Sequence, residues 1–102
     1  MARASTDIYG NANSAQDIRD INRQIRGEMR GVRGRDQLTE LKKRADYLCA
    51  LAMAPSWKEK FGGEITKILK AAKEEEEKTT EQANRLAKKH GWDADYDPWG
   101  GG

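Results

Sequence analysis

The sequence contains one cysteine and one histidine, Cys49 and His90, which are the first candidates for catalytic chemistry. Cys49 falls on the apolar side of a predicted helix, where a thiol behaves as a small buried hydrophobe. His90 comes at the end of the next long helix, where an imidazole can hydrogen-bond the last carbonyl groups. The two residues lie on separate predicted helices, so the sequence predicts no catalytic pair and no enzyme activity.

Carboxylates are the candidate metal ligands. The run "KEEEEK" at 73–78 contains no histidine and has no flanking ligands at metal-binding spacing, so it is interpreted as a solvated helical face. The aspartates Asp93, Asp95 and Asp97 have the spacing that begins a calcium loop. However, Pro98 stands where that loop needs glycine, and no glutamate follows at the twelfth position. We therefore expect neither a metal nor a cofactor.

Arginines recur every three or four residues in the segment 19–35, "RDINRQIRGEMRGVRGR". Residues 19–44 include nine basic and four acidic residues, a local charge of +5. Arginine's planar guanidinium grips a carboxylate or a phosphate at two points, which a solvated lysine does poorly. The segment therefore predicts a partner-binding helix face, composed of Arg19, Arg23, Arg26, Arg30 and Arg33, followed by Arg35.

The partner of this face has three interpretations. The first is an acidic surface of another protein, and the alternative is the phosphate backbone of a nucleic acid. The third is a solvated flank whose arginine stems cover apolar neighbours. No aromatic residue stands among the arginines to stack on bases. Gly27, Gly31 and Gly34 follow the outermost line of the helix, where each costs about 1 kcal/mol against alanine but lets another chain approach closely.

The segment 91–102, "GWDADYDPWGGG", is an acidic aromatic tail whose Trp92, Tyr96 and Trp99 have no predicted helix to pack on. One interpretation is a linear motif whose aromatic residues dock in a partner's pocket. A second is that the tail folds back, with its aspartates facing the arginines and a tryptophan covering the core. A third is a tail without order. The aromatic residues are predicted to bind a partner protein.

The hydrophobic periodicity predicts an all-α fold, because apolar residues recur at helical spacing and strand-like alternation is absent. A flexible arm (1–13) precedes a helical domain (14–90), which the tail follows. We expect a small three-helix bundle with short connections. Its predicted helices cover about 15–32, 37–54 and 64–90, with a short helical turn at 56–61.

The third predicted helix carries Glu75, Glu76 and Thr79 in the middle of its otherwise apolar face. Because short helices cannot cover such a middle, we expect this helix to project partly from the bundle into water. The heptad-like positions Ile65, Ala72, Thr79 and Leu86 also predict self-association, and hence a homo-oligomer.

Composition limits the remaining possibilities. With 102 residues, the chain can bury one core, and Leu, Ile, Val and Phe together number fourteen, which indicates a thin core. The net charge of +2 is too low to be typical of a disordered chain. The single cysteine fits a reducing compartment, and the longest apolar run, "LCALAMA", is far too short to span a membrane. The sequence therefore predicts a soluble cytoplasmic protein without enzyme activity.

Overall fold

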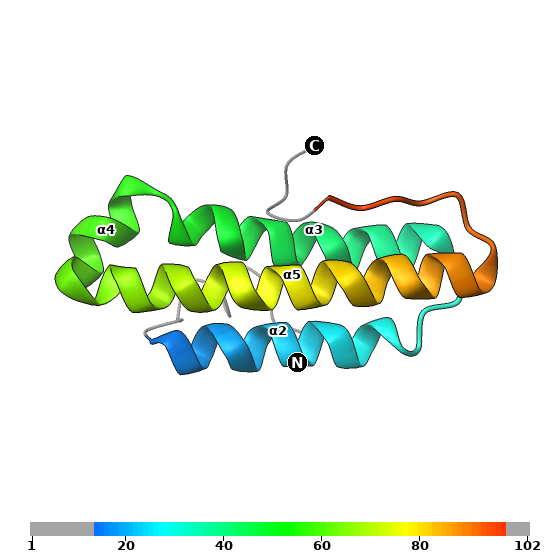
Figure 1. Ribbon diagram of the computed structural model, residues 1–102, viewed down its shortest axis with the longest axis horizontal. Coiled ribbons are helices and arrows are strands. Elements are labelled where there is room, and N and C mark those ends of the chain that lie inside the picture. The colour runs from blue at the N-terminus through cyan, green and yellow to red at the C-terminus, as the bar shows by residue number, and fades with distance from the viewer. Residues whose placement is uncertain (1–13, 98–102) are drawn as a thin grey trace, which may run out of the picture.

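The computed structural model describes residues 14–97, which form three long helices and a short helical connection. The helices, labelled as in Figure 1, are α2 (Ala15–Met29), α3 (Arg35–Ala52), α4 (Pro55–Phe61), the 3-10 turn η1 (Gly62–Glu64) and α5 (Ile65–His90). The predicted arm at 1–13 and the predicted partner-binding residue Trp99 lie outside the described residues.

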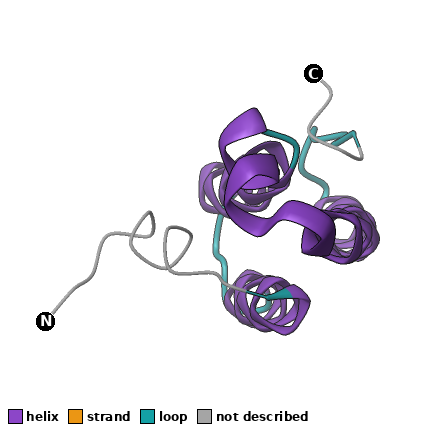
Figure 2. Cartoon of the chain, turned by 90° about the vertical axis from the view of Figure 1, so that its left-hand side faces the viewer, coloured by secondary structure: helices purple, strands orange, loops and turns teal. Residues whose placement is uncertain are grey.

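The three long helices pack side by side. α2 and α5 run in the same direction, and α3 runs in the opposite direction (Figure 1). Viewed end on, the three helices occupy the corners of a triangle, and the short helix α4 crosses one end (Figure 2). The predicted class, a small all-α three-helix bundle, is confirmed for the described part of the chain.

Local sequence signals define where the helices begin and end. The Ser14 side chain caps α2 by accepting a hydrogen bond of 3.2 Å from the backbone N–H of Asp17. Gly91 ends α5 in the left-handed conformation, with φ of 74°, and the Trp92 N–H bonds the Ala87 carbonyl at 2.9 Å. α2 ends at Met29 rather than near residue 32, and the glycine-rich sequence that follows forms a turn.

The apolar core follows the predicted stripes. α2 contributes four large side chains at spacings of three and four residues, and α3 and α5 contribute leucines, isoleucine and many alanines. Trp57 and Phe61 of α4 pack edge to face, with ring centroids 5.3 Å apart, and close one end of the core. The large buried apolar side chains of the three long helices are Ile18, Ile21, Ile25, Met29, Leu38, Leu41, Leu48 and Ile68.

The middle of α5 does not project into water, and this part of the prediction is wrong. Glu76 is 1% exposed and Thr79 is fully buried, and Glu75 and Thr80 are buried with them. α5 packs against both α2 and α3 along its length, from Ile68 to Ala87. The polar residues are buried because α2 and α3 provide partners of complementary charge and hydrogen-bonding capacity.

The same packing covers the face that was predicted to drive self-association. Ala72 and Thr79 are buried inside the single chain, and Ile65 and Leu86 are partly buried against its core. This face of α5 is therefore not available to a second copy. Among the described residues, no helix is long and apolar enough to cross a membrane.

Candidate functional site

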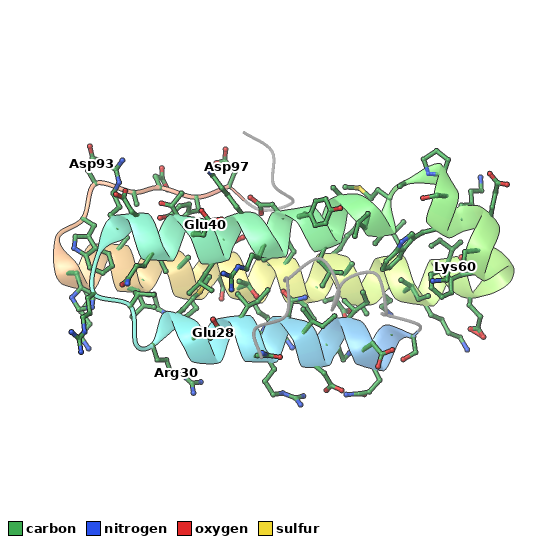
Figure 3. All side chains as sticks on the ribbon, turned by 180° about the vertical axis from the view of Figure 1, so that it is seen from behind. Glu28, Arg30, Glu40, Lys60, Asp93 and Asp97 are labelled. Atoms are coloured by element: carbon green, nitrogen blue, oxygen red, sulfur yellow. The ribbon has the colours of Figure 1, made fainter. Side chains whose placement is uncertain are left out.

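Four arginines of the first helix and the turn after it form a basic surface, which we call the arginine surface: Arg19, Arg23, Arg30 and Arg33. Arg23 has 69% of its side chain exposed and lies 3.3 Å from Asp20 on the same helix. Arg30 and Arg33 are exposed, and the Arg30 side chain points away from the bundle (Figure 3). The guanidinium groups of Arg19, Arg30 and Arg33 form no ion pair with another described residue, so they are available to a ligand.

The basic surface continues from α2 onto α5. Lys78 is 64% exposed, and its Nζ lies 3.5 Å from Oε2 of Glu75, the residue that pairs with Arg26 of α2. Arg85 is also exposed and follows Lys78 by seven residues, so the two side chains lie on nearly the same side of α5. A ligand that contacts α2 on this side therefore also meets cations of α5.

Arg26 lies on the predicted face but turns into the bundle. Its side chain is 17% exposed; Nη1 lies 2.9 Å from Glu75 Oε1 and donates a hydrogen bond of 3.2 Å to Thr79 Oγ1. The Arg26 carbonyl accepts a hydrogen bond of 2.7 Å from Gln82. Arg26 therefore links α2 to α5.

The interior of the bundle contains two groups of hydrogen-bonded polar side chains, one around Lys42 and one around Thr79, which we together call the polar core. Lys42 of α3 is the centre of the first group, because Nζ donates hydrogen bonds to Asp46, to Glu76 Oε2 at 2.9 Å and to the Asp97 carbonyl at 3.0 Å. All three donors of the ammonium group are therefore used. The members of the polar core are Asn22, Arg26, Lys42, Asp46, Glu75, Glu76 and Thr79.

The second half of the polar core joins α2 to α5. Thr79 Oγ1 donates a hydrogen bond of 3.0 Å to Asn22 Oδ1, and Asn22 Nδ2 donates one of 3.0 Å to the Ile18 carbonyl. Three buried oxygens, Glu75 Oε1, Glu76 Oε1 and Thr80 Oγ1, have no hydrogen-bond partner among the described residues, although Glu75 Oε1 is ion-paired with Arg26 at 2.9 Å. The polar core is thus largely, but not completely, satisfied.

Electrostatics in the polar core favour a protonated Glu76. Burial raises the pKa of Glu76 to about 8, and the neighbouring Asp46 carboxyl adds to this rise, while Lys42 opposes it. Burial alone would lower the pKa of Lys42, but its hydrogen bonds to Asp46 and Glu76 raise that pKa above its ordinary value. Lys42 therefore stays charged and Glu76 is mostly neutral near pH 7.

The described part of the tail, residues 92–97, folds back along α3 and α5, and we call it the strap (Figures 1 and 3). Trp92 and Tyr96, two predicted partner-binding residues, pack partly buried against the core of their own chain. The Trp92 ring stacks on His90 with centroids 4.5 Å apart. Of the interpretations open from the sequence, the structure favours the folded-back tail.

The aspartates of the strap do not face the arginine surface. Asp93, Asp95 and Asp97 are exposed, and Asp93 and Asp97 point away from the bundle (Figure 3). Arg35, the last predicted arginine, contacts the strap through its main chain: Nη1 donates a hydrogen bond of 3.2 Å to the Asp93 carbonyl. The acidic side chains thus form a surface of their own beside α3.

The remaining candidates for chemistry are placed apart. Cys49 is buried, and burial first, then the carboxylates of Glu76 and Asp46, raise the pKa of its thiol to about 11, so it remains protonated. His90 lies far from this thiol. At 1.5 Å per residue, it is about 20 Å further along α5 than Glu76, one of the carboxyl groups that act on Cys49. Among residues 14–97, no group of three or more His, Cys, Asp or Glu side chains is arranged to hold a metal ion.

A shallow hollow of about 400 Å³ lies between α2 and α3. Glu28 and Arg44 face each other across it at 3.5 Å, with Val32 and Leu41 as its apolar part. Its lining contains neither the cysteine nor the histidine.

Sequence reasoning missed the polar core and the residues that hold the strap. Lys42 and Asp46 stand four residues apart on one face of α3, the spacing of a helical ion pair, but that signal also fits an exposed pair. Asn84 gave no signal, because its role is to bind the main chain of the strap. Glu75 and Glu76 on α5 are opposite in charge to the cations of α2 and α3 that pair with them. This complementarity could have indicated that the two glutamates are buried.

Taken together, the fold and surfaces define a helical bundle with an arginine surface on one side and the exposed aspartates of the strap on another. Comparison with protein-family models, with curated proteins and with solved structures found no significant match.

Proposed function

We propose that the protein is a small non-enzymatic adaptor or modulator that binds an acidic surface of another protein through the arginine surface. The observation that carries this proposal is the series of arginines along α2 and the turn after it: Arg23, Arg30 and Arg33 are exposed and Arg19 is half-buried. Of these, Arg19, Arg30 and Arg33 have no charged partner among the described residues. Guanidinium groups without an internal partner can form two-point contacts with carboxylates.

An acidic protein fits this surface better than a nucleic acid does. Asp20 is 54% exposed beside Arg23, and a phosphate chain that follows α2 would pass this carboxylate. The described residues of the surface include no aromatic ring on which a base could stack. A protein partner can place its carboxylates beside the arginines and place no negative charge opposite Asp20.

A cytoplasmic location and a homo-oligomeric state belong to the same proposal. The lone buried Cys49 suits a reducing compartment. The small apolar content of the chain favours additional stability from contacts with other copies.

Fluorescence anisotropy with labelled probes tests the proposal. The probes are an oligoglutamate peptide of about ten residues, a duplex DNA and a single-stranded RNA, each at about 50 and 200 mM salt. We expect the acidic peptide to bind, and the double variant Arg23→Gln/Arg30→Gln to bind it about tenfold more weakly, since each lost ion pair contributes up to about 1 kcal/mol.

The matched control is Lys58→Gln/Lys60→Gln, which removes the same charge from the exposed face of α4. It should leave binding unchanged if the arginine surface is the site. Tighter binding of DNA or RNA than of the peptide, with a steep loss as salt rises, would support the nucleic-acid alternative instead. Equal weakening by both double variants would mean that net charge, not this surface, controls binding.

A further inference from the structure

The strap contacts both α3 and α5, through Arg35, Thr39 and Lys42 of α3 and Asn84 of α5, and we call the surface that it covers the groove. Its contacts pair Asp93 with Arg35 and Asp97 with Lys42, so it runs parallel to α3. It runs antiparallel to α5, where it leaves the helix end at Gly91 and returns to Asn84. Side chains along the strap alternate in exposure, as in an extended peptide: Trp92, Ala94 and Tyr96 are half-buried, and Asp93, Asp95 and Asp97 are exposed. Its backbone is tightened at Asp93, where the Ala94 N–H donates to the Trp92 carbonyl at 3.0 Å.

The groove holds the strap mainly through hydrogen bonds to the main chain of the strap. The Asn84 amide binds both polar groups of one residue: Nδ2 donates to the Tyr96 carbonyl at 3.0 Å, and the Tyr96 N–H donates to Oδ1 at 2.7 Å. Lys42 and Arg35 donate to two further carbonyls, at 3.0 and 3.2 Å. These four hydrogen bonds would form equally well with any extended chain in the same place.

Two side-chain contacts make the groove selective. The Thr39 and Tyr96 hydroxyl oxygens lie 2.7 Å apart, so the groove recognises a phenol at this position. Trp92 stacks on the exposed ring of His90 at the other end. Main-chain hydrogen bonds that supply affinity, with side-chain sites at alternating residues that supply specificity, are the usual pattern of extended-peptide recognition.

We propose that the groove between α3 and α5 is a peptide-binding site. Its partner is an extended segment of another protein that carries an aromatic residue and, four residues further on, a tyrosine. The strap occupies the site as an internal competitor. The groove lies on α3 and α5, away from the exposed arginines of α2, so this inference does not depend on the proposed function.

The chemistry of the strap identifies the partner's chemistry. The groove's donors Arg35, Lys42 and Asn84 all point to main-chain carbonyls, so the partner needs an extended backbone rather than a helix. The strap's exposed aspartates make no contact with these donors through their carboxylates, so acidic side chains are tolerated but not required. The partner is therefore defined by two aromatic residues on one edge of an extended chain.

The strap's tether makes it a strong competitor. A segment joined to its site through a short linker has an effective concentration on the order of millimolar. A free peptide with the same contacts should therefore bind the wild-type protein weakly. It should bind at least about tenfold more tightly once the strap is weakened.

The test uses the full chain and a labelled peptide, GWDADYD, which copies residues 91–97. Binding is followed by anisotropy to the wild type, to Tyr96→Ala, and to Asp95→Ala as the matched strap control. We expect at least about tenfold tighter binding to Tyr96→Ala than to the other two proteins, since Asp95 is exposed and its loss leaves the strap in place. A scrambled peptide, GDYADWD, should bind none of them.

A second arm separates recognition from misfolding. In the Tyr96→Ala background, Thr39→Val should weaken binding of GWDADYD severalfold, but should leave binding of the phenylalanine peptide GWDADFD unchanged. A folding defect would weaken both peptides alike, and circular dichroism of each variant checks helix content.

The proposal is overturned if GWDADYD fails to bind Tyr96→Ala at millimolar concentration, or if Asn84→Ala in that background binds it unchanged. It is also overturned if light scattering shows that wild-type copies exchange straps and that Asn84→Ala abolishes the resulting dimer. The occupant of the groove in trans would then be a second copy.

Discussion

At the scale of single residues, Lys42 and Glu76 form the least expected contact of the protein. Glu76 is 1% exposed, and Oε1, one of its two carboxyl oxygens, has no hydrogen-bond partner among the described residues. Lys42 shares its one positive charge between Glu76 and Asp46. One cation cannot neutralise two carboxylates, and Glu76 is the one that is fully buried, so a proton on Glu76 is the least costly arrangement.

This arrangement makes stability depend on pH. The folded protein binds the Glu76 proton more tightly than the unfolded chain does, because the pKa rises from 4.5 to about 8 on folding. Stability from this group is therefore complete below pH 4.5 and decreases as the pH rises toward 8. Glu76→Gln should remove this decrease. Between pH 4.5 and about 8, the free energy of unfolding of the variant should therefore rise relative to that of the wild type by at most about 1.4 kcal/mol per pH unit.

Urea unfolding of both proteins at several pH values between 5 and 9 measures the effect. The control is Glu77→Gln, which changes the exposed neighbouring carboxylate and should give a constant difference from the wild type. Parallel stability curves for Glu76→Gln and the wild type would mean that Glu76 is ionised throughout the range.

At the scale of helices, apolar periodicity was enough to predict three long helices and their core faces. Ile18, Ile21, Ile25 and Met29 are buried as their spacing predicts, because a stripe at three- and four-residue spacing can only be covered by other helices. The middle of α5 could not be predicted in this way. Periodicity treats every Glu or Thr as solvent-facing, whereas burial depends on partners such as Lys42, which come from other helices.

The candidate site was predicted less well than the fold for the same reason. Arg26 has the same sequence spacing as Arg23 and Arg30, and the carboxylate that turns it inward, Glu75, is far away in the sequence. Likewise, the strap's docking depends on Asn84 and Thr39, whose polar side chains have no pattern that marks a groove.

A substitution at Gly27 tests how helix propensity in α2 affects the stability of the protein. It lies inside the helix, and an added Cβ there would meet no atom within 4 Å. Gly27→Ala should therefore stabilise the protein by about 1 kcal/mol, because alanine loses less backbone entropy on folding. For a domain of this size, thermal unfolding should shift upward by about 4–8 °C.

Gly91→Ala is the contrasting variant, since Gly91 has φ of 74° and alanine is strained there. It should lower the unfolding temperature, although an added Cβ would also meet no atom within 4 Å. If Gly27→Ala fails to stabilise, helix propensity does not control this part of α2. If it stabilises but weakens binding of the acidic peptide, the glycine serves close approach of the partner.

At the scale of the whole molecule, charge is divided between two sides. The strap directs Asp93, Asp95 and Asp97 outward from one side, and Arg30 points outward from the opposite side, beyond α2 (Figure 3). The small net charge of +2 conceals this separation. Because the apolar face of α5 is buried, the predicted homo-oligomer needs another contact, and opposite charges on opposite sides provide one.

Such a contact joins unlike surfaces, so copies would associate head to tail, as an open chain or, where the rotation between neighbours closes, as a ring. We expect the weight-average mass from light scattering to rise with protein concentration at about 20 mM salt and to return to that of the 11.5 kDa chain at about 500 mM, where charges are screened beyond about 4 Å. Asp93→Asn/Asp95→Asn should reduce the association, whereas Glu59→Gln/Glu77→Gln, the same charge change on α4 and α5, should not. Association that survives high salt would instead indicate an apolar interface, and a constant monomer mass at every concentration would contradict the predicted homo-oligomer.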